Sequence, residues 1–227
     1  MANHLDLEEQ EQLDQLKHFW KQYGNIITWA LIAVLGSYGG WNFYQYWQRN
    51  QAAQASAMFD EVDRVARSGD LPKLDRALGD MKDKFASTAY AQQAALLAAR
   101  VYAEAGKNDQ AQSALSWVAE STKDEGYQAV ARLRLAAVLA ESKAYDEAIK
   151  QLTGSFPASF LPLVADRKAD VLMLQGKRDE AKAEYLKAYQ SFQQSSEYRR
   201  LVEIKLNSLG VDPRVSAGSS ASDEVKK

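Results

Sequence analysis

The sequence predicts an all-α protein in which one transmembrane helix is followed by a stack of helical hairpins and a C-terminal capping helix. Three observations predict this architecture. No charged residue lies between Lys21 and Arg49, the chain beyond Arg49 is dense in helix formers, and three segments of that second part repeat. No alternating run of β-branched residues reaches the length of a strand, so no sheet is expected.

Residues 1–24 are predicted to be a cytoplasmic leader that contains an amphipathic helix. Leu13, Leu16 and Trp20 share one helical stripe, whereas the acidic residues fall largely on other faces. Such a helix can lie on the membrane or on a partner. A partly ordered leader is the alternative.

Residues 25–47 are predicted to cross a membrane once. A helix needs roughly 20 residues to cross about 30 Å of hydrocarbon, and a charge near the bilayer centre costs roughly 2.5 to 3.5 kcal/mol. Aromatic residues gather at both ends of the span, where their rings favour the headgroup region: Trp20 and Tyr23, then Trp41, Phe43, Tyr44, Tyr46 and Trp47. Polar and small residues dilute the span, and a buried helix of a soluble protein is the alternative.

A cleaved signal peptide fits this N-terminus less well. Its beginning is long and acidic, and the nearest A-x-A sequence, at 55–57, lies well beyond the aromatic cluster. Lys17 and Lys21 precede the span and only Arg49 follows it closely, so the positive-inside rule places the N-terminus in the cytoplasm and the C-terminal part across the membrane.

Composition excludes several classes of site. The formal charge of −2 gives no sign of a nucleic-acid surface, and the absence of cysteine excludes disulfides and thiolate metal sites. The two histidines, His4 and His18, precede the span, so the large domain has no imidazole. No phosphate-binding or nucleophile motif is present. We therefore expect no catalysis, no metal and no cofactor.

Three helical hairpins are predicted within the domain at residues 48–209. Aligning Ala111, Ala148 and Ala181, which are 37 and 33 residues apart, brings further small, bulky and turn positions into register. The aligned sets are Ala99, Ala136 and Ala169; Tyr102, Leu139 and Leu172; Gly106, Lys143 and Gly176; and Leu115, Leu152 and Tyr185. Small residues let two helices approach closely while bulky residues fill the remaining space.

These columns resemble the tetratricopeptide repeat, although its tryptophan column is replaced by Ala95, Arg132 and Ala165. A poorer hairpin is predicted before them, from about 52–68 and 72–85. The segment 197–208 is predicted to cap the stack by laying Tyr198, Leu201, Ile204 and Leu209 over its open end, with Arg199, Arg200, Glu203 and Lys205 outside. Residues 210–227 are short of large apolar side chains and are predicted to be a disordered tail.

Two surfaces are candidates for partner binding. First helices line the inner wall of such a stack, which predicts a groove for a peptide or a partner helix. The wall positions are Gln93, Leu96, Arg100, Glu104, Val130, Leu133, Ala137, Glu141, Asp166, Asp170 and Met173, of which Arg100, Glu104, Glu141 and Asp170 carry charges that would read a partner. In the span, Gly36 and Gly40 form a G-x-x-x-G pair that would admit another transmembrane helix.

The whole arrangement resembles the YfgM-type family of bacterial inner-membrane proteins, the ancillary subunits of the SecYEG translocon. The resemblance is carried by "QLKHFWKQYGN", "TAYAQQAALLAA", "LSWV" and "RLRLAAVL", and it covers about residues 5–209. The third unit departs slightly, with Ala169 where a glycine is expected. The resemblance implies a single-pass inner-membrane protein with a cytoplasmic N-terminus and a periplasmic tetratricopeptide-like domain. It also implies association with SecYEG, the chaperone PpiD and newly exported proteins.

Two other classes of protein stay open on the residues alone. An envelope assembly or division scaffold has the same build and would be distinguished by the complexes that copurify in mild detergent. A soluble cytoplasmic repeat protein with the aromatic helix in its core would be released from membranes by carbonate extraction.

Overall fold

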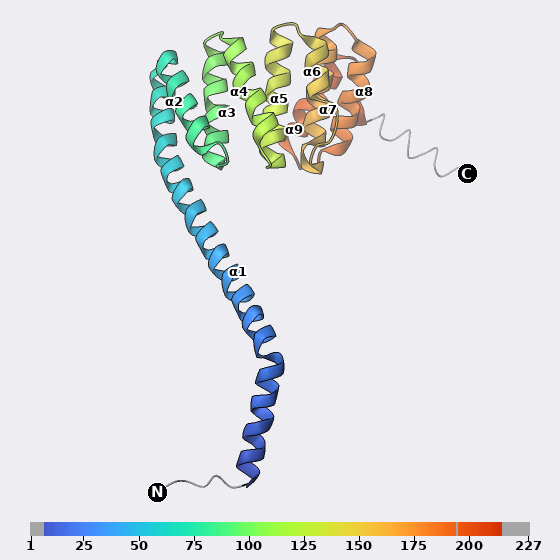
Figure 1. The fold of residues 1–227 in the computed structure, drawn as a ribbon. Helices are drawn as coiled ribbons and strands as arrows, with labels where there is room; N and C mark the ends of the chain where they lie inside the picture. Colours follow the sequence, from blue (N-terminus) through green and yellow to red (C-terminus); the bar gives the residue numbers. More distant parts are fainter. Residues whose placement is uncertain (1–6, 194, 215–227) are drawn as a thin grey trace, which may run out of the picture. The chain divides into compact units, whose positions relative to one another are not determined.

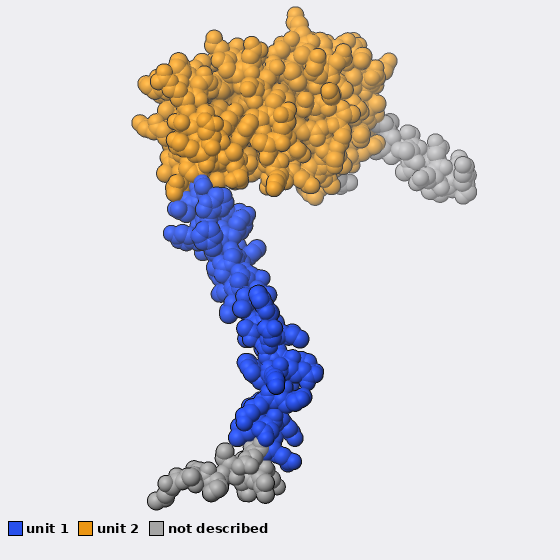
Figure 2. All heavy atoms as spheres, in the orientation of Figure 1, with its two compact units in different colours: residues 1–53 blue, residues 54–227 orange. Residues whose placement is uncertain are grey.

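The computed structural model describes residues 7–193 and 195–214, and every regular element in these ranges is a helix. The chain divides into two compact units, residues 1–53 and 54–227, which Figure 2 colours separately. The predicted all-α class is therefore confirmed.

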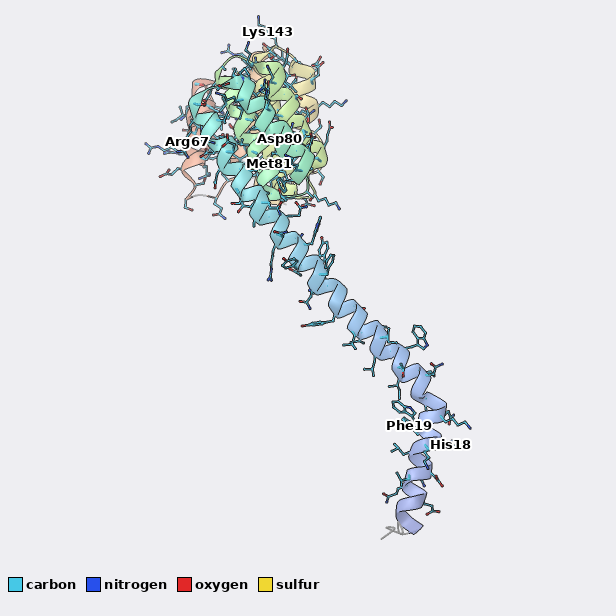
Figure 3. The ribbon with its side chains drawn as sticks, turned by 60° about the vertical axis from the view of Figure 1, so that its left-hand side comes forward. His18, Phe19, Arg67, Asp80, Met81 and Lys143 are labelled. Atoms are coloured by element: carbon cyan, nitrogen blue, oxygen red, sulfur yellow. The ribbon has the colours of Figure 1, made fainter. Side chains whose placement is uncertain are left out.

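Helix α1 (Leu7–Ser68) contains both the predicted leader helix and the predicted span, without a break at residue 24. It includes a segment long and apolar enough to cross a membrane, and none of that segment is buried within the chain. Side chains such as His18 and Phe19 stand out from α1 in Figure 3. This exposure argues against the alternative of a core helix.

Polar side chains in the span are satisfied by the backbone of their own helix. Thr28 Oγ1 donates to the carbonyl of Gly24 at 2.7 Å, and Ser37 Oγ donates to that of Ala33 at 2.7 Å. Bonding of this kind removes the need for water, so these residues are compatible with a lipid environment.

The second unit is a series of helical hairpins whose helices α2 to α8 lie side by side in chain order (Figure 1). Their bounds are α2 (Leu71–Phe85), α3 (Ala89–Glu104), α4 (Asn108–Ser121), α5 (Glu125–Glu141), α6 (Tyr145–Gln151), η1 (Ala158–Phe160), α7 (Leu161–Leu174), α8 (Arg178–Ser191) and α9 (Glu197–Ser208). The three predicted hairpins are α3 with α4, α5 with α6 and α7 with α8. The predicted fourth consists of the end of α1 and α2, whose first turn is capped by Asp70.

The small residues of the aligned columns lie in the interior of the hairpins. All six aligned alanines are buried: Ala99, Ala111, Ala136, Ala148, Ala169 and Ala181. Five of the six aligned bulky residues are buried with them, namely Tyr102, Leu115, Leu152, Leu172 and Tyr185, and the sixth, Leu139, is half-buried against the same core. The sequence alignment therefore predicted the inner face of each unit correctly.

The turn column adopts the left-handed conformation in all three units. The φ angle is +70° at Gly106, +62° at Lys143 and +80° at Gly176. In each turn the next amide reaches back to the aligned bulky residue, as in Lys107 N to the Tyr102 carbonyl at 2.8 Å. This is the Schellman motif, which satisfies the last carbonyls of a helix. Lys143, labelled in Figure 3, thus adopts a left-handed conformation that normally favours glycine.

Arg132 occupies the position where the tetratricopeptide repeat has a tryptophan, and its side chain binds the loop after the short helix α6. Its guanidinium donates to the carbonyls of Gln151 and Ser155, each at 3.0 Å, and of Thr153, and it lies 4.1 Å from the ring centre of Phe156. Burial lowers the pKa of Arg132 from its usual value. Hydrogen bonding to a loop has replaced aromatic packing at this position.

Helix α9 has the predicted bounds but not the predicted face. Tyr198 and Leu209 pack inward as expected, together with Val202 and Leu206, which are fully buried. Leu201 and Ile204 are 44% and 59% exposed, so their assignment to the inner face was wrong. The inward row 198, 202, 206 follows the i, i+4 ridge of the helix, and this rotation turns Lys205 toward α7 rather than outward.

The prediction placed the start of the tail, at residue 210, too early in the chain. Val211 packs against the core cluster of α7, α8 and α9, and Pro213 is fully buried. Arg214 forms an ion pair with Glu203 of α9. The chain therefore packs against the domain as far as residue 214, and the rest of the predicted tail lies outside the described residues.

Candidate functional site

The predicted wall charges of α3 and α5 are exposed. Arg100 Nε donates to Glu104 Oε1 at 2.7 Å, one turn along α3, and both side chains remain largely in solvent. This hydrogen bond and the nearby carboxylate raise the pKa of Arg100. Glu141 is exposed at the end of α5. These three groups are available to a partner, and their part in binding one stays a prediction.

Other predicted wall positions hold neighbouring units together. Leu96 is buried, and its carbonyl accepts from Arg134 Nη1 at 3.4 Å. Gln93 Nε2 donates to the hydroxyl of Tyr127 at 2.6 Å, which joins α3 to α5. Leu96 therefore does not face a groove, and Gln93 has a structural partner.

The third unit differs because α9 covers its acidic wall positions. Lys205 Nζ donates to Asp166 Oδ1 at 2.8 Å and to Asp170 Oδ1 at 2.7 Å. Tyr198 of α9 donates to Asp166 Oδ2 at 2.8 Å, and Tyr185 of α8 donates to Asp170 Oδ1 at 2.6 Å. Asp166 is almost completely buried. Both carboxylates are thus occupied within the chain, which weighs against the partner-binding role predicted for Asp170.

The tyrosines of this cluster keep their protons over a wide range of pH. Burial, reinforced by the hydrogen bond to Asp170, raises the pKa of the Tyr185 hydroxyl far above its usual value. Burial and the bond to Asp166 do the same for Tyr198. The cluster is accordingly a set of protonated donors around two carboxylates, which holds α7, α8 and α9 together.

An arginine-lined hollow on α9 was not predicted. It has a volume of about 420 Å³ and is lined by Ser196, Arg199, Arg200, Glu203, Ile204, Asn207 and Arg214. The sequence assigned Arg199 and Arg200 only to a polar outer face, and Arg214 to the tail. The one signal for the hollow was the pair of adjacent arginines near the start of the helix.

The glycine pair of the span is exposed. Apart from its chain neighbours and the backbone of its own helix, a β-carbon added at Gly36 or Gly40 would meet no atom of the described residues within 4 Å, and the same holds for Gly39. The described residues thus leave this small-residue face free for another helix, and that contact stays a prediction.

No group of three or more His, Cys, Asp or Glu residues in the described ranges could hold a metal ion. The observed clusters combine carboxylates with lysine, arginine and tyrosine, whose bonds link one helix to the next. Their chemistry is that of packing and protein contact.

The chain is similar in sequence to a family of known proteins. Residues 17–211 match the family described as "Tetratricopeptide repeat-like domain". A relative from Neisseria gonorrhoeae is 34% identical over 92% of this chain and 100% of its own length. Relatives from Haemophilus influenzae and Escherichia coli are 29% and 24% identical, each over 89% of this chain and over 98% and 97% of their own lengths. All three relatives are named "Ancillary SecYEG translocon subunit".

Proposed function

The chain belongs to the tetratricopeptide repeat-like family that includes the ancillary SecYEG translocon subunits, and from this membership we propose that it is a membrane-anchored interaction module of that translocon. It would act by binding rather than by catalysis. The helical hairpins offer surfaces and turns, and the anchor determines which complexes these surfaces meet.

One observation carries the proposal: the match to the Neisseria gonorrhoeae relative covers 100% of that protein and 92% of this chain. A match of that extent takes in the apolar segment of α1 as well as the hairpin stack of this chain. A relative matched only through its repeats would support protein binding in general. Similarity that includes the span supports a function at the membrane.

The finer parts of the proposal concern side and partners. The bias of Lys17 and Lys21 over Arg49 supports a cytoplasmic N-terminus and a periplasmic domain. In that compartment the domain would pass newly exported proteins to the chaperone PpiD. Arg100 and Glu104 on α3 and Glu141 on α5 are the exposed charges that would contact a partner.

The span would contact a transmembrane helix of the translocon through Gly36 and Gly40. Without side chains at these positions two helix backbones can approach closely, which favours packing in lipid. Thr28 and Ser37 would not compete for that contact, because their hydroxyl groups already bond to their own helix.

Photo-crosslinking in intact cells tests the proposal. Benzoylphenylalanine at Phe43, two turns from Gly36 on the same side of α1, should cross-link to SecY. Tyr38 is the matched control, because it is similarly exposed but points roughly to the opposite side. Equivalent probes at Glu141 and at exposed Gln110 on α4 test the predicted groove.

The products decide between the candidate functions. Cross-links to SecY from Phe43, and to PpiD or exported chains from Glu141, would support the proposal. Recovery of division or envelope-assembly proteins in place of SecYEG would overturn the translocon association. Equal yields from Phe43 and Tyr38 would remove the glycine contact alone.

A further inference from the structure

Helix α9 leaves apolar side chains in solvent at a place where a capping helix normally has a polar surface. Leu201 and Ile204 are 44% and 59% exposed and lie about one turn apart, on the side of α9 away from Val202 and Leu206. The end of a helical stack is expected to be polar, since it has no further repeat to cover it. Two neighbouring exposed aliphatic residues at this end of the stack indicate a surface that another molecule covers.

Cationic groups border the same side of the helix. The hollow of about 420 Å³ includes Ile204 in its lining together with Arg199, Arg200 and Arg214, against the single carboxylate of Glu203. The lining therefore carries an excess of positive charge, although the whole chain has a formal charge of −2. Such a local excess favours an anionic ligand.

Two of the guanidinium groups are already held in position. Arg199 Nε donates to the carbonyl of Tyr189 at 3.1 Å and its guanidinium lies 3.9 Å from the centre of that ring. Arg214 pairs with Glu203. Binding to side chains that are already ordered costs less conformational entropy, because these side chains need not be immobilised by the ligand. Both groups retain further N–H donors.

Arg200 is the free charge of the surface. Its side chain is exposed, and its guanidinium forms no hydrogen bond or ion pair with residues 7–193 and 195–214. Its planar fork can bind a carboxylate through two parallel hydrogen bonds. Ile204 lies about one helical turn beyond Arg200, so a ligand can combine an ionic contact with an apolar one.

We propose that the α9 surface formed by Leu201, Ile204 and the arginine-lined hollow binds an acidic amphipathic helix of a partner protein. Carboxylates of that helix bind Arg200 and its neighbours, and its aliphatic residues cover Leu201 and Ile204. A bilayer offers the same combination of anionic and apolar groups. A polar hollow suits an inserted side chain better than a flat headgroup layer, and two aliphatic side chains give little area for insertion.

This site lies apart from the predicted wall of α3 and α5 and does not depend on the association with SecYEG. Its test uses the full chain in nanodiscs of zwitterionic phosphatidylcholine. The probe is a fluorescent synthetic helix of about four turns with glutamates on one face and leucines on the other. A matched probe carries lysines in place of the glutamates. The acidic probe should bind and the basic one should not, and added salt should weaken binding.

Charge reversal tests the residues. Arg200→Glu should weaken binding of the acidic probe at least about tenfold, and Ile204→Ser should weaken it measurably. Arg178→Glu is the matched control, because Arg178 is an exposed arginine of the neighbouring helix α8 outside the hollow. Equal loss in the Arg200 and Arg178 variants, or equal binding of both probes, would overturn the proposal.

A single fluorophore distinguishes protein from lipid as the occupant. The chain has no cysteine, so Asn207→Cys places one label at the hollow. A blue shift caused by the acidic probe in phosphatidylcholine discs supports the proposal. The same shift in discs that contain phosphatidylglycerol, without any probe, would identify the membrane surface as the occupant and overturn it.

Discussion

Lys205 Nζ of α9 donates to Asp166 Oδ1 of α7 at 2.8 Å, and Asp166 is only 1% exposed. Lys205→Met would leave the buried carboxylate without its cation, which typically costs about 3 to 5 kcal/mol. Urea unfolding monitored by circular dichroism should show this loss. Lys187→Met is the control, since Lys187 pairs with Glu184 at 3.9 Å with its side chain largely exposed, and should cost under about 1 kcal/mol. Equal losses in the two variants would contradict the assigned role of Lys205.

Lys143 occupies a left-handed position that Gly106 and Gly176 hold in the other units. A side chain there costs roughly 1 to 2 kcal/mol, part of which glycine returns through the greater freedom of the unfolded chain. Lys143→Gly should therefore stabilise the domain by about 0.5 to 1 kcal/mol, measured as a rise in Tm by calorimetry. Gly106→Ala and Gly176→Ala should lower Tm. Only backbone strain would be responsible, because an added β-carbon meets no atom within 4 Å at either glycine.

Arg132 donates to three carbonyls of the segment that follows α6. Arg132→Met should destabilise the domain by roughly 2 to 3 kcal/mol, because hydrogen bonds from a charged donor are lost together. Arg132→Lys keeps the charge but not the fork and should recover only part of the loss. Limited proteolysis should find 152–157 cleaved faster in both variants. Arg134→Lys, which alters one longer bond at 3.4 Å, is the control and should cleave like the parent.

Alkaline pH should weaken the domain through Tyr102, Tyr185 and Tyr198. Burial raises the pKa of each, reinforced by a hydrogen bond to Asp75, Asp170 or Asp166. Because the folded pKa lies above the unfolded value of about 10, their stabilisation is complete below pH ~10 and is lost as pH rises above it. The free energy of unfolding should fall by about 1.4 kcal/mol per pH unit for each tyrosine. Tyr185→Phe should make the decline shallower; an unchanged slope would contradict this linkage.

The exposed charges on α3 and α5 allow a test that leaves the fold intact. Replacing Arg100, Glu104 and Glu141 by alanine should lower recovery of PpiD and exported chains in a pull-down. Thermal stability should change little, since an exposed pair such as Arg100 with Glu104 contributes under about 1 kcal/mol. The matched control replaces Glu120, Glu147 and Lys187, exposed on second helices. Asp170 is left intact because its loss would disturb α9.

The sequence predicted those features of the fold that a short spacing determines. The alanine columns and the turn at Gly106, Lys143 and Gly176 could be aligned because the pattern within one hairpin recurs after 37 and 33 residues, and the bounds of α9 follow from residues near its own ends. The structure agrees with each of them.

The orientation of α9 could not be predicted in this way. Hydrophobicity alone favours Leu201 and Ile204 as inner residues as strongly as Val202 and Leu206. The deciding contact joins Lys205 to Asp166, 39 residues away in sequence, and periodicity within one helix carries no information about it. The arginine-lined hollow was missed for the same reason, since it combines α9 with Arg214 beyond its end.

The aspartates under α9 also bear on which unit can precede it in such an array. At the two wall positions where the third unit has Asp166 and Asp170, the first has Leu96 and Arg100 and the second has Leu133 and Ala137. Lys205 thus matches the third unit and neither of the others. If a duplication or deletion moved α9 onto another unit, its ammonium group would face leucine and the aspartates would lose their cation. The ion cluster therefore suits α9 only to the unit that carries Asp166 and Asp170, so an array with a different repeat placed directly before α9 should be less stable.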